Sequence, residues 1–402
     1  MRILVLAPQP FFQQRGTPIA VRMLVESLAR LGHVIELLVY HEGDPIHIDG
    51  VTLHRIPRIP LVRNIPPGPS WKKLPCDFAM LLCAFRLVRK KRIDLIHAVE
   101  ESAFLAAFLQ PLLRVPYVYD MDSSLAEQTA AKWHLPRWLV RILENMENAV
   151  IRRSRGVVAV CAALENRARQ AAPQHLIQRL EDVSLLQPGP TGPNFREIHA
   201  ITGPIVMYVG NLERYQGIDL LLDSFALAVT RGTMAHLLLI GGTAGHIAHY
   251  EQRAAALRIS SRVRFVGPRP LEELHWNLQQ ADVLVSPRTE GTNTPMKVYS
   301  YLDSGRPVLA TRLPTHLQVL DDDVALLADP TPESMAGALM EITSDAALRD
   351  RLAAQARARV AAEYTPAAFE QKVGAFYGRL MQIAPGLPAG GQGSDEHVSA
   401  TR

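Results

Sequence analysis

Short apolar runs alternate with longer amphipathic stretches along most of this chain. Each run is long enough for one buried strand, and each stretch has the periodic spacing of a helix. Strands that alternate with helices are typical of a parallel sheet covered by helices, so the expected fold class is α/β. The runs occupy 3–7, 34–40, 94–98, 117–119, 157–160, 205–209, 237–240, 263–266, 283–285 and 308–310, with helices expected at 17–30, 217–230 and 247–257 among others.

The alternation stops once, in a stretch rich in proline and glycine at 187–204. It then restarts, which predicts two Rossmann-like, doubly wound domains at 1–186 and 205–364, joined by that linker. Two such domains would present the carboxyl ends of their strands to a central cleft. A further helix is expected at 365–383, and the polar segment 384–402 is expected to be disordered because little of it is apolar.

Composition allows two ordinary domains, because 48% of the 402 residues are hydrophobic and can form two cores. The longest apolar run, 78–85, is far shorter than a membrane span, and the first run is too short for a signal peptide. The three cysteines, Cys76, Cys83 and Cys161, have neither a disulfide framework nor a metal-ligand spacing. A cytoplasmic protein with reduced thiols is therefore expected.

The net charge of +4 is unevenly spread along the chain. Residues 1–200 hold 25 Lys and Arg against 18 Asp and Glu, whereas residues 201–402 hold 18 against 21. A basic first half indicates an anionic partner such as a phospholipid surface. Nucleic acid is not expected, because no nucleic-acid-binding motif is present.

Segment 71–92 combines aromatic, apolar and basic residues. Trp71 and two lysines precede the apolar run 78–85, and basic residues close the segment. This order is typical of an interfacial helix on anionic lipid, which would place the protein at the inner face of the membrane. The alternative is a buried helix of a Rossmann layer that has a basic end.

The loop at 286–297 carries the clearest candidate chemistry. It follows the apolar run 283–285, and ligands of open α/β sheets bind at the carboxyl ends of the strands. Thr294-Pro295 predicts a capped helix start, with Lys297 one turn inside, and N–H groups at a helix start suit a phosphate. A plain capped turn is the alternative. The residues that would meet a ligand here are Glu290, Gly291, Thr292, Asn293 and Thr294.

Four segments, in order, resemble a family-4 glycosyltransferase of the GT-B fold. They are the glycine loop RGTP at 15–18, YVGNLERYQG at 208–217, VRFVG at 263–267, and the stretch from Glu290-Gly291 to Gly305-Arg306-Pro307-Val308. The second is similar to the family's VGRLxxxKG segment and the third to its VxFxG strand. The resemblance covers about 1–380.

The resemblance implies a retaining, metal-independent transfer of sugar from a nucleotide diphosphate sugar to an acceptor. The C-terminal domain would hold the donor and the N-terminal domain the acceptor, a sugar or lipid-linked molecule in surface polysaccharide or glycolipid synthesis. Helix N-termini and basic side chains can stabilise the diphosphate leaving group in place of a metal. No resident cofactor is expected, because the nucleotide sugar is a substrate.

The chain departs from the family pattern at three positions. The family's Arg and Lys fall at Asn211 and Gln216, and its second Glu, which contacts the ribose, falls at Ser300. Our hypothesis is that Lys297, Arg288 or Arg214 replaces the missing cations.

The predicted catalytic residues are Glu290 and Asp122. Asp122 stands where many family members have a His near the reacting carbon, so it would contact a donor hydroxyl or accept the acceptor's proton, unless it only caps a helix. Asp120 and Asp122 also match a D-x-D metal signature of a different fold, and a metal is not expected. The predicted donor-binding residues are Gly16, Thr17, Gly210, Asn211, Arg214, Gln216, Arg288, Gly291, Thr292, Asn293, Thr294, Lys297 and Ser300.

Two other functions fit the same fold. A nucleotide-sugar epimerase would turn over its substrate without an acceptor. A catalytically silent scaffold, which the missing cations would favour, would bind no nucleotide. Glu100 and Glu101 follow a predicted strand, but such acids more often cap the next helix, so they are left out of the predicted site.

Overall fold

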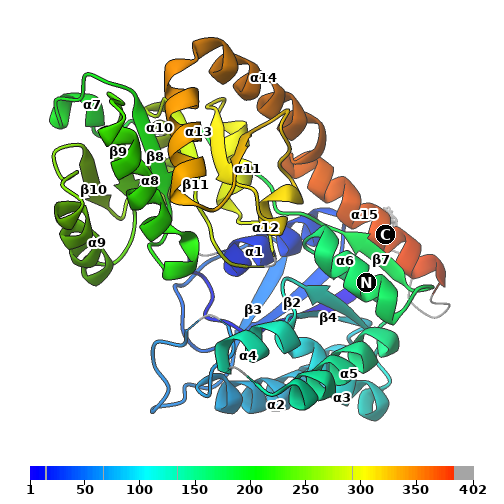
Figure 1. Ribbon diagram of the computed structural model, residues 1–402. Helices are drawn as coiled ribbons and strands as arrows, with labels where there is room; N and C mark the ends of the chain where they lie inside the picture. Colours follow the sequence, from blue (N-terminus) through cyan, green and yellow to red (C-terminus); the bar gives the residue numbers. More distant parts are fainter. Residues whose placement is uncertain (14–15, 67, 134, 292, 384–402) are drawn as a thin grey trace, which may run out of the picture. The chain divides into compact units, whose positions relative to one another are not determined.

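The computed structural model describes residues 1–383 except positions 14, 15, 67, 134 and 292. It divides into two compact units, one formed by Met1–Leu180 with the chain from Glu370, the other by Glu181–Phe369 (Figure 1). Each unit is a parallel sheet with helices on its faces, so the predicted α/β class is confirmed.

The first unit contains a seven-stranded parallel sheet in the order β3-β2-β1-β4-β5-β6-β7. Its strands are β1 (Arg2–Ala7), β2 (Val34–Val39), β3 (Val51–Arg55), β4 (Leu95–Val99), β5 (Tyr117–Met121), β6 (Gly156–Ala159) and β7 (Leu176–Arg179). Its helices are α1 (Gly16–Arg30), α2 (Lys73–Lys91), α3 (Ser102–Leu113), α4 (Leu125–Trp133), α5 (Arg137–Arg153), α6 (Ala162–Ala171) and α15 (Pro366–Ile383).

The second unit contains a six-stranded parallel sheet in the order β10-β9-β8-β11-β12-β13. Its strands are β8 (Ile205–Val209), β9 (His236–Ile240), β10 (Val263–Gly267), β11 (Val283–Ser286), β12 (Val308–Thr311) and β13 (Leu326–Ala328). Its α-helices are α7 (Phe195–Ile198), α8 (Ile218–Thr230), α9 (Ala244–Ala256), α10 (Leu274–Gln279), α11 (Lys297–Asp303), α12 (Pro314–Leu317), α13 (Pro332–Ser344) and α14 (Ala346–Glu363), and short 3-10 turns span Arg214–Gln216 and Leu271–Glu273.

Both sheets reverse their strand order beside the first strand of the unit. The reversal falls between β1 and β4 in the first unit and between β8 and β11 in the second. Loops diverge to opposite faces at such a point, which leaves the crevice where doubly wound sheets bind ligands. The loops after β8 and β11, which contain most of the predicted donor-binding residues, therefore leave the sheet side by side.

All ten predicted strands are present, because each is a largely apolar run; the sheets bury nine of them almost completely, and the edge strand β10 is half-buried. The sequence missed β3, β7 and β13. Each is the last strand at one end of its sheet. β3 and β7 include polar side chains that stay half-exposed, and β13 is only three residues long, so their apolar pattern is weak.

The predicted domain boundaries differ from the two units. The predicted linker 187–204 lies inside the second unit, where Asn194 caps α7 by accepting from the N–H groups of Arg196 and Glu197. Segment 384–402, for which disorder is predicted, lies outside the described residues.

Helix α15 belongs to the first unit from Glu370 onwards and is not a separate element after the second. The hydroxyl of Tyr377 lies 2.7 Å from Nδ1 of the buried His97, and Arg30 pairs with Glu370 at 2.8 Å. These contacts join the end of the chain to its first 180 residues, which no local pattern could reveal.

Candidate functional site

Glycine 210 begins the loop after β8 and lies against the side chain of Lys297. Its φ of 153° falls in the region that favours glycine, and a Cβ there would lie only 2.8 Å from Nζ of Lys297. Gly210 therefore allows the lysine to approach the end of β8.

The hydrogen bonds described for Lys297 go to neutral groups. Its Nζ donates to the hydroxyl of Tyr208 at 2.8 Å and to Oε1 of Gln216 at 3.0 Å, and it lies 4.0 Å from the centroid of the Tyr208 ring. Burial lowers the pKa of Lys297 well below its usual range, and the charge of Arg288 lowers it further. Lys297 thus contacts Gln216, the position where the resemblance expects a lysine.

The start of α11 differs from the prediction. The helix begins at Lys297 after Met296, whereas Thr294 and Pro295 lie in the preceding loop. The N–H groups around Asn293 and Thr294 therefore precede the helix and are not its N-terminus. Thr292, predicted to bind donor, lies outside the described residues.

Arg288 organises the loop that contains Glu290. Its Nε donates to the carbonyl of Glu290 at 2.6 Å, and its Nη1 donates to the carbonyl of Asn293 at 3.1 Å. Its guanidinium lies 5.3 Å from the Tyr215 ring centroid, and only 8% of the residue is exposed. A side chain at Gly291, where φ is 128°, would collide with this guanidinium. Arg288 therefore holds the loop in place.

The side chains of Glu290, Asn211 and Arg214 are exposed around this loop. Asn211 accepts a hydrogen bond from the N–H of Glu213 at 3.3 Å. Ser300 is different, because it is 2% exposed and its Oγ accepts from the N–H of Leu185 at 3.0 Å. That hydroxyl is used inside the unit, so the predicted ribose contact by Ser300 is not supported by its position.

His316 was missed by the sequence analysis and lies behind the loop. Its Nε2 meets Ser286 Oγ at 2.9 Å, and its Nδ1 lies 2.8 Å from the carbonyl of Thr311. Thr311 Oγ1 in turn donates to the carbonyl of Arg288 at 2.6 Å. Burial lowers the pKa of His316 to about 4, so the neutral ring ties β11 to β12. Its sequence surroundings carry no motif that could have identified it.

In the first unit, two glutamates and a lysine meet at the ends of β4 and β5. Glu101 forms a close ion pair with Lys73, and Ser123 Oγ donates to Glu100 at 3.3 Å. Burial, and then the charge of Glu101, raise the pKa of Glu100 to about 7. The sequence signal was a pair of acids directly after a buried strand. Because Lys73 is buried and paired, it cannot be one of the basic residues that meet a membrane.

A second buried acid lies beside this group. The Tyr40 hydroxyl donates to Asp77, and burial raises the pKa of Asp77 to about 7. Both residues sit at the carboxyl end of the sheet, Tyr40 after β2 and Asp77 in the first turns of α2.

Asp122 follows β5 and is half-exposed. In the first turn of α4, Ser124 Oγ accepts from the N–H of Glu127 at 3.2 Å. Asp120 bonds to Nε2 of His97 at 2.9 Å. In the described part of the chain, no three His, Cys, Asp or Glu side chains are placed to share a metal ion.

Gly16 and Thr17 are the first two residues of α1. A Cβ built on Gly16 would meet nothing within 4 Å among the described residues.

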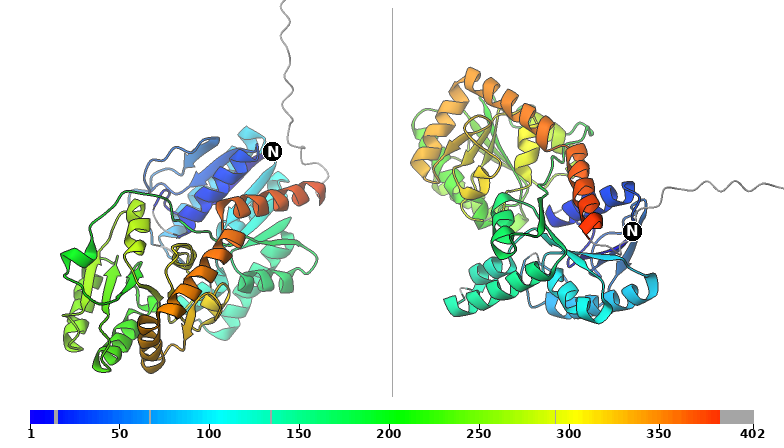
Figure 2. Two further views of the ribbon diagram at one scale, coloured as in Figure 1. Left: turned by 90° about the horizontal axis from the view of Figure 1, so that it is seen from above. Right: turned by 90° about the vertical axis from the view of Figure 1, so that its right-hand side faces the viewer.

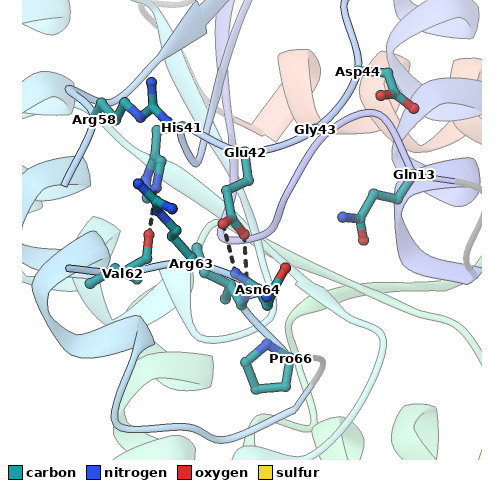
Figure 3. Close-up of a pocket in the computed structure, with 11 residues that line it drawn as sticks. Gln13, His41, Glu42, Gly43, Asp44, Arg58, Val62, Arg63, Asn64 and Pro66 are labelled. Atoms are coloured by element: carbon teal, nitrogen blue, oxygen red, sulfur yellow. Dashed lines mark hydrogen bonds between the residues drawn. The ribbon is translucent and has the colours of Figure 1, made fainter. Parts of the chain in front are cut away.

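The first unit also contains a polar hollow of about 940 Å³ beyond β2 and β3 (Figure 3). The Glu42 carboxylate accepts from the N–H groups of Asn64 and Ile65 at 2.7 and 3.0 Å, and His41 Nε2 lies 3.1 Å from the Val62 carbonyl. These bonds hold the two loops that form its wall. The hollow is lined by Gln13, His41, Glu42, Gly43, Asp44, Arg58, Val62, Arg63, Asn64, Ile65 and Pro66.

Two family models match the chain, one in each unit. Residues 15–177 match "Glycosyl transferase 4-like domain" and residues 203–345 match "Glycosyl transferases group 1". The matched segments contain all four motifs on which the resemblance depends.

Curated relatives include two bacterial D-inositol 3-phosphate glycosyltransferases. The chain is 31% identical to that of Corynebacterium diphtheriae over 183 residues, 43% of this chain and 42% of that protein. It is 25% identical to that of Corynebacterium urealyticum over 359 residues, 82% of each. The first alignment thus spans less than half of the relative.

Solved structures share the whole two-unit architecture. Sucrose-phosphate synthase from Thermosynechococcus elongatus superimposes with a TM-score of 0.75 at 20% identity, covering 95% of this chain and all of that one. Anabaena HepE in complex with UDP gives 0.73 at 16% identity over 94% of this chain and all of that one. WaaG, a glycosyltransferase of lipopolysaccharide biosynthesis, gives 0.70 at 14% identity over the same shares. At these identities the likeness shows the fold, which is GT-B as predicted.

Proposed function

This chain is a glycosyltransferase of family 4 with the GT-B fold, and we propose that it moves a sugar from a nucleotide diphosphate sugar to an acceptor hydroxyl, with retention and without a metal. The observation that carries this proposal is Lys297, a partly buried cation that donates to Tyr208 and Gln216 beside the point where the strand order of the second unit reverses. HepE was crystallised with UDP and with UDP-glucose, which supports a donor of this class.

Lys297 would bind the diphosphate. An amine with a depressed pKa regains its proton when an anion arrives, because the anion stabilises the charged form. Nucleotide binding should therefore take up protons above the pKa of the free lysine. Gly210 and Gly291 keep the surrounding backbone close, and the N–H groups at Asn293 and Thr294 would add further donors.

Glu290 would bind the hydroxyls of the donor sugar, because its carboxylate is exposed and the loop that contains it is held in place by Arg288. The acceptor oxygen would attack the anomeric carbon on the face from which the diphosphate departs, and its proton would pass to the diphosphate. Such a transfer retains configuration without a protein nucleophile. Asn211 and Arg214 would contact the donor at the rim.

The first unit would hold the acceptor, with Asp122, Gly16 and Thr17 facing the reacting groups. Glu100, whose raised pKa keeps part of the population protonated near neutrality, can both donate to and accept from a hydroxyl. A sugar or lipid-linked acceptor for surface polysaccharide or glycolipid synthesis fits a cytoplasmic protein at the inner face of a membrane.

A phosphorylated cyclitol is a second candidate acceptor. The relatives are named for D-inositol 3-phosphate, and the hollow in the first unit contains Arg58 and Arg63, whose guanidinium groups suit a phosphate. Comparing inositol phosphate with neutral sugars as acceptors in one transfer assay separates the two.

The first test is calorimetric titration with UDP, GDP, ADP and dTDP. Tight binding of one nucleotide, followed by acceptor-dependent release of that nucleotide from its sugar, is expected. If none binds, the silent scaffold replaces the transferase. If the sugar nucleotide is converted without an acceptor, the protein is an epimerase instead.

A further inference from the structure

The outer side of α2 exposes an apolar stripe that ends in positive charge. Leu74, Phe78 and Leu82 are each between 44% and 64% exposed and recur every fourth residue, so they share one helix face. Arg86 continues the same line one turn later. The opposite side of α2, which includes Met80, packs into the core, so the outer stripe is not needed for folding.

Helix α5 repeats this arrangement. Trp138, Ile142 and Met146 are 64%, 45% and 50% exposed and again lie four residues apart. Arg137 and Arg141 are exposed beside them, one residue earlier on the helix. An apolar stripe flanked by arginines is the pattern of a helix that lies in a membrane interface.

The stripes form one continuous face, which we call the outer face of α2, α3 and α5. Helix α3 packs against both α2 and α5 and adds Phe108 and Leu112, each 60% exposed. These helices lie together along one edge of the first unit, its lower edge in Figure 1 and in the right-hand view of Figure 2. At one end the Trp71 and Trp133 rings are 5.6 Å apart. Three of the chain's four tryptophans thus belong to this region.

The exposed charged residues of this region are almost all basic. Its exposed basic residues are Lys72, Arg86, Arg89, Lys90, Arg92, Arg114, Lys132, Arg137, Arg141, Arg152 and Arg153. The acids of α2 and α5, which are Asp77, Glu144 and Glu147, and Glu127 of the neighbouring α4 are all partly or fully buried. Among the described residues of these helices, no strongly exposed carboxylate opposes the positive charge.

We propose that the outer face of α2, α3 and α5 binds the surface of an anionic lipid bilayer, with the apolar stripes inserted among the headgroups and the basic residues on lipid phosphates. A contiguous exposed apolar surface on this scale marks an interaction site. A second copy of the chain is disfavoured as the occupant, because a symmetric dimer would bring the same positive charges face to face. No helix of the described chain is long and apolar enough to cross the bilayer, so the attachment is peripheral.

This surface extends the sequence-based expectation for 71–92. It adds α3 and α5 and removes the buried residues of α2, including Lys73. It does not depend on the chemistry of sugar transfer, so failure of one proposal leaves the other intact.

The test is co-sedimentation of the full chain with vesicles of phosphatidylcholine alone or mixed with phosphatidylglycerol. Binding to the anionic vesicles is expected, with a blue shift of tryptophan fluorescence as the rings leave water. Phe78→Ser with Ile142→Ser should weaken partition at least about tenfold, since each buries a large side chain in the interface. Arg137→Gln with Arg141→Gln should weaken it about fivefold per charge removed, the equivalent of about 1 kcal/mol each.

The matched controls replace exposed apolar and basic residues that do not belong to the outer face of α2, α3 and α5. Leu61→Ser with Met234→Ser removes two exposed apolar side chains, and Arg231→Gln with Arg258→Gln removes two exposed charges of the second unit. These should leave vesicle binding unchanged. Failure of the wild-type chain to bind anionic vesicles, or equal binding by the outer-face variants, overturns the proposal. A dimer in sedimentation equilibrium that the outer-face variants abolish would assign the surface to a second copy instead.

Discussion

The buried Lys73 of the first unit and the partly buried Lys297 of the second have opposite surroundings. Lys73 of the first unit is paired with Glu101, whereas the hydrogen bonds described for Lys297 of the second go to the neutral Tyr208 and Gln216. Burial alone would lower the pKa of Lys73, but Glu101 and then Glu100 outweigh burial and raise it. Burial lowers that of Lys297 well below its usual range.

This difference in surroundings distinguishes a lysine whose charge is already paired inside the fold from a lysine whose charge can pair with a ligand. A buried lysine that has a carboxylate partner is already neutralised and offers little to an external anion. A buried lysine held by neutral groups carries an uncompensated cost that an incoming diphosphate would remove. On this ground we propose that Lys297 of the second unit binds the anion and that the acids of the first unit contact hydroxyl groups.

The largest effect expected is on turnover when Lys297 is removed. Lys297→Ala should reduce kcat/KM for sugar transfer by about 100-fold or more, the scale of one lost group that stabilises developing charge. Affinity for the nucleoside diphosphate should fall with it. The matched control is Arg258→Ala, an exposed cation of the same unit, and equal losses in both variants would remove Lys297 from the site.

The second prediction is that one substitution has opposite effects on stability at the two lysines. Lys73→Met leaves Glu101 buried without its partner and should lower the free energy of unfolding by about 3 kcal/mol. Lys297→Met removes an uncompensated charge and should leave stability unchanged or raised. Urea denaturation of both variants measures these changes. The double variant Lys73→Met/Glu101→Gln should recover most of the free energy of unfolding that Lys73→Met loses. Similar losses of unfolding free energy at both positions would contradict the proposed difference between Lys73 and Lys297.

Glu290 is expected to contribute less than Lys297. Glu290→Gln should lower turnover by at least about tenfold, equivalent to about 1.4 kcal/mol of one polar contact in the transition state. Steady-state kinetics should show the loss mainly in kcat. Unchanged turnover would leave the anchored loop with a role in binding only.

A further prediction concerns the pH dependence of stability through Glu100. Its pKa rises from 4.5 in the unfolded chain to about 7 in the fold, so folding favours the protonated form. The stabilisation is complete below the lower value and is lost as pH rises through the higher one. Thermal unfolding should therefore show the wild type losing stability relative to Glu100→Gln across this window. Parallel profiles would place Glu100 in a more hydrated setting.

Local patterns suggested the donor-site residues but could not show their contacts. Gly210, Glu290 and Gly291 were selected because glycine and acid residues follow buried strands in a recognisable order. Ser300 was predicted to contact the ribose, and only the fold shows that its hydroxyl accepts from the N–H of Leu185, more than a hundred positions earlier in the chain. His316 was missed because only folding brings it beside Ser286 and Thr311.

The amino-acid sequence by itself determined the βαβ alternation, the ten main strands and the family, because buried parallel strands are continuous apolar runs and motifs are contiguous. Tertiary structure decided which charges find partners and which faces stay in water. Lys73 and Arg86 both belong to α2, yet Lys73 is buried against Glu101 and Arg86 is exposed. Helix α15 joins the first unit because Tyr377 reaches His97. Burial and long-range pairing are properties of packing, and a linear pattern does not contain them.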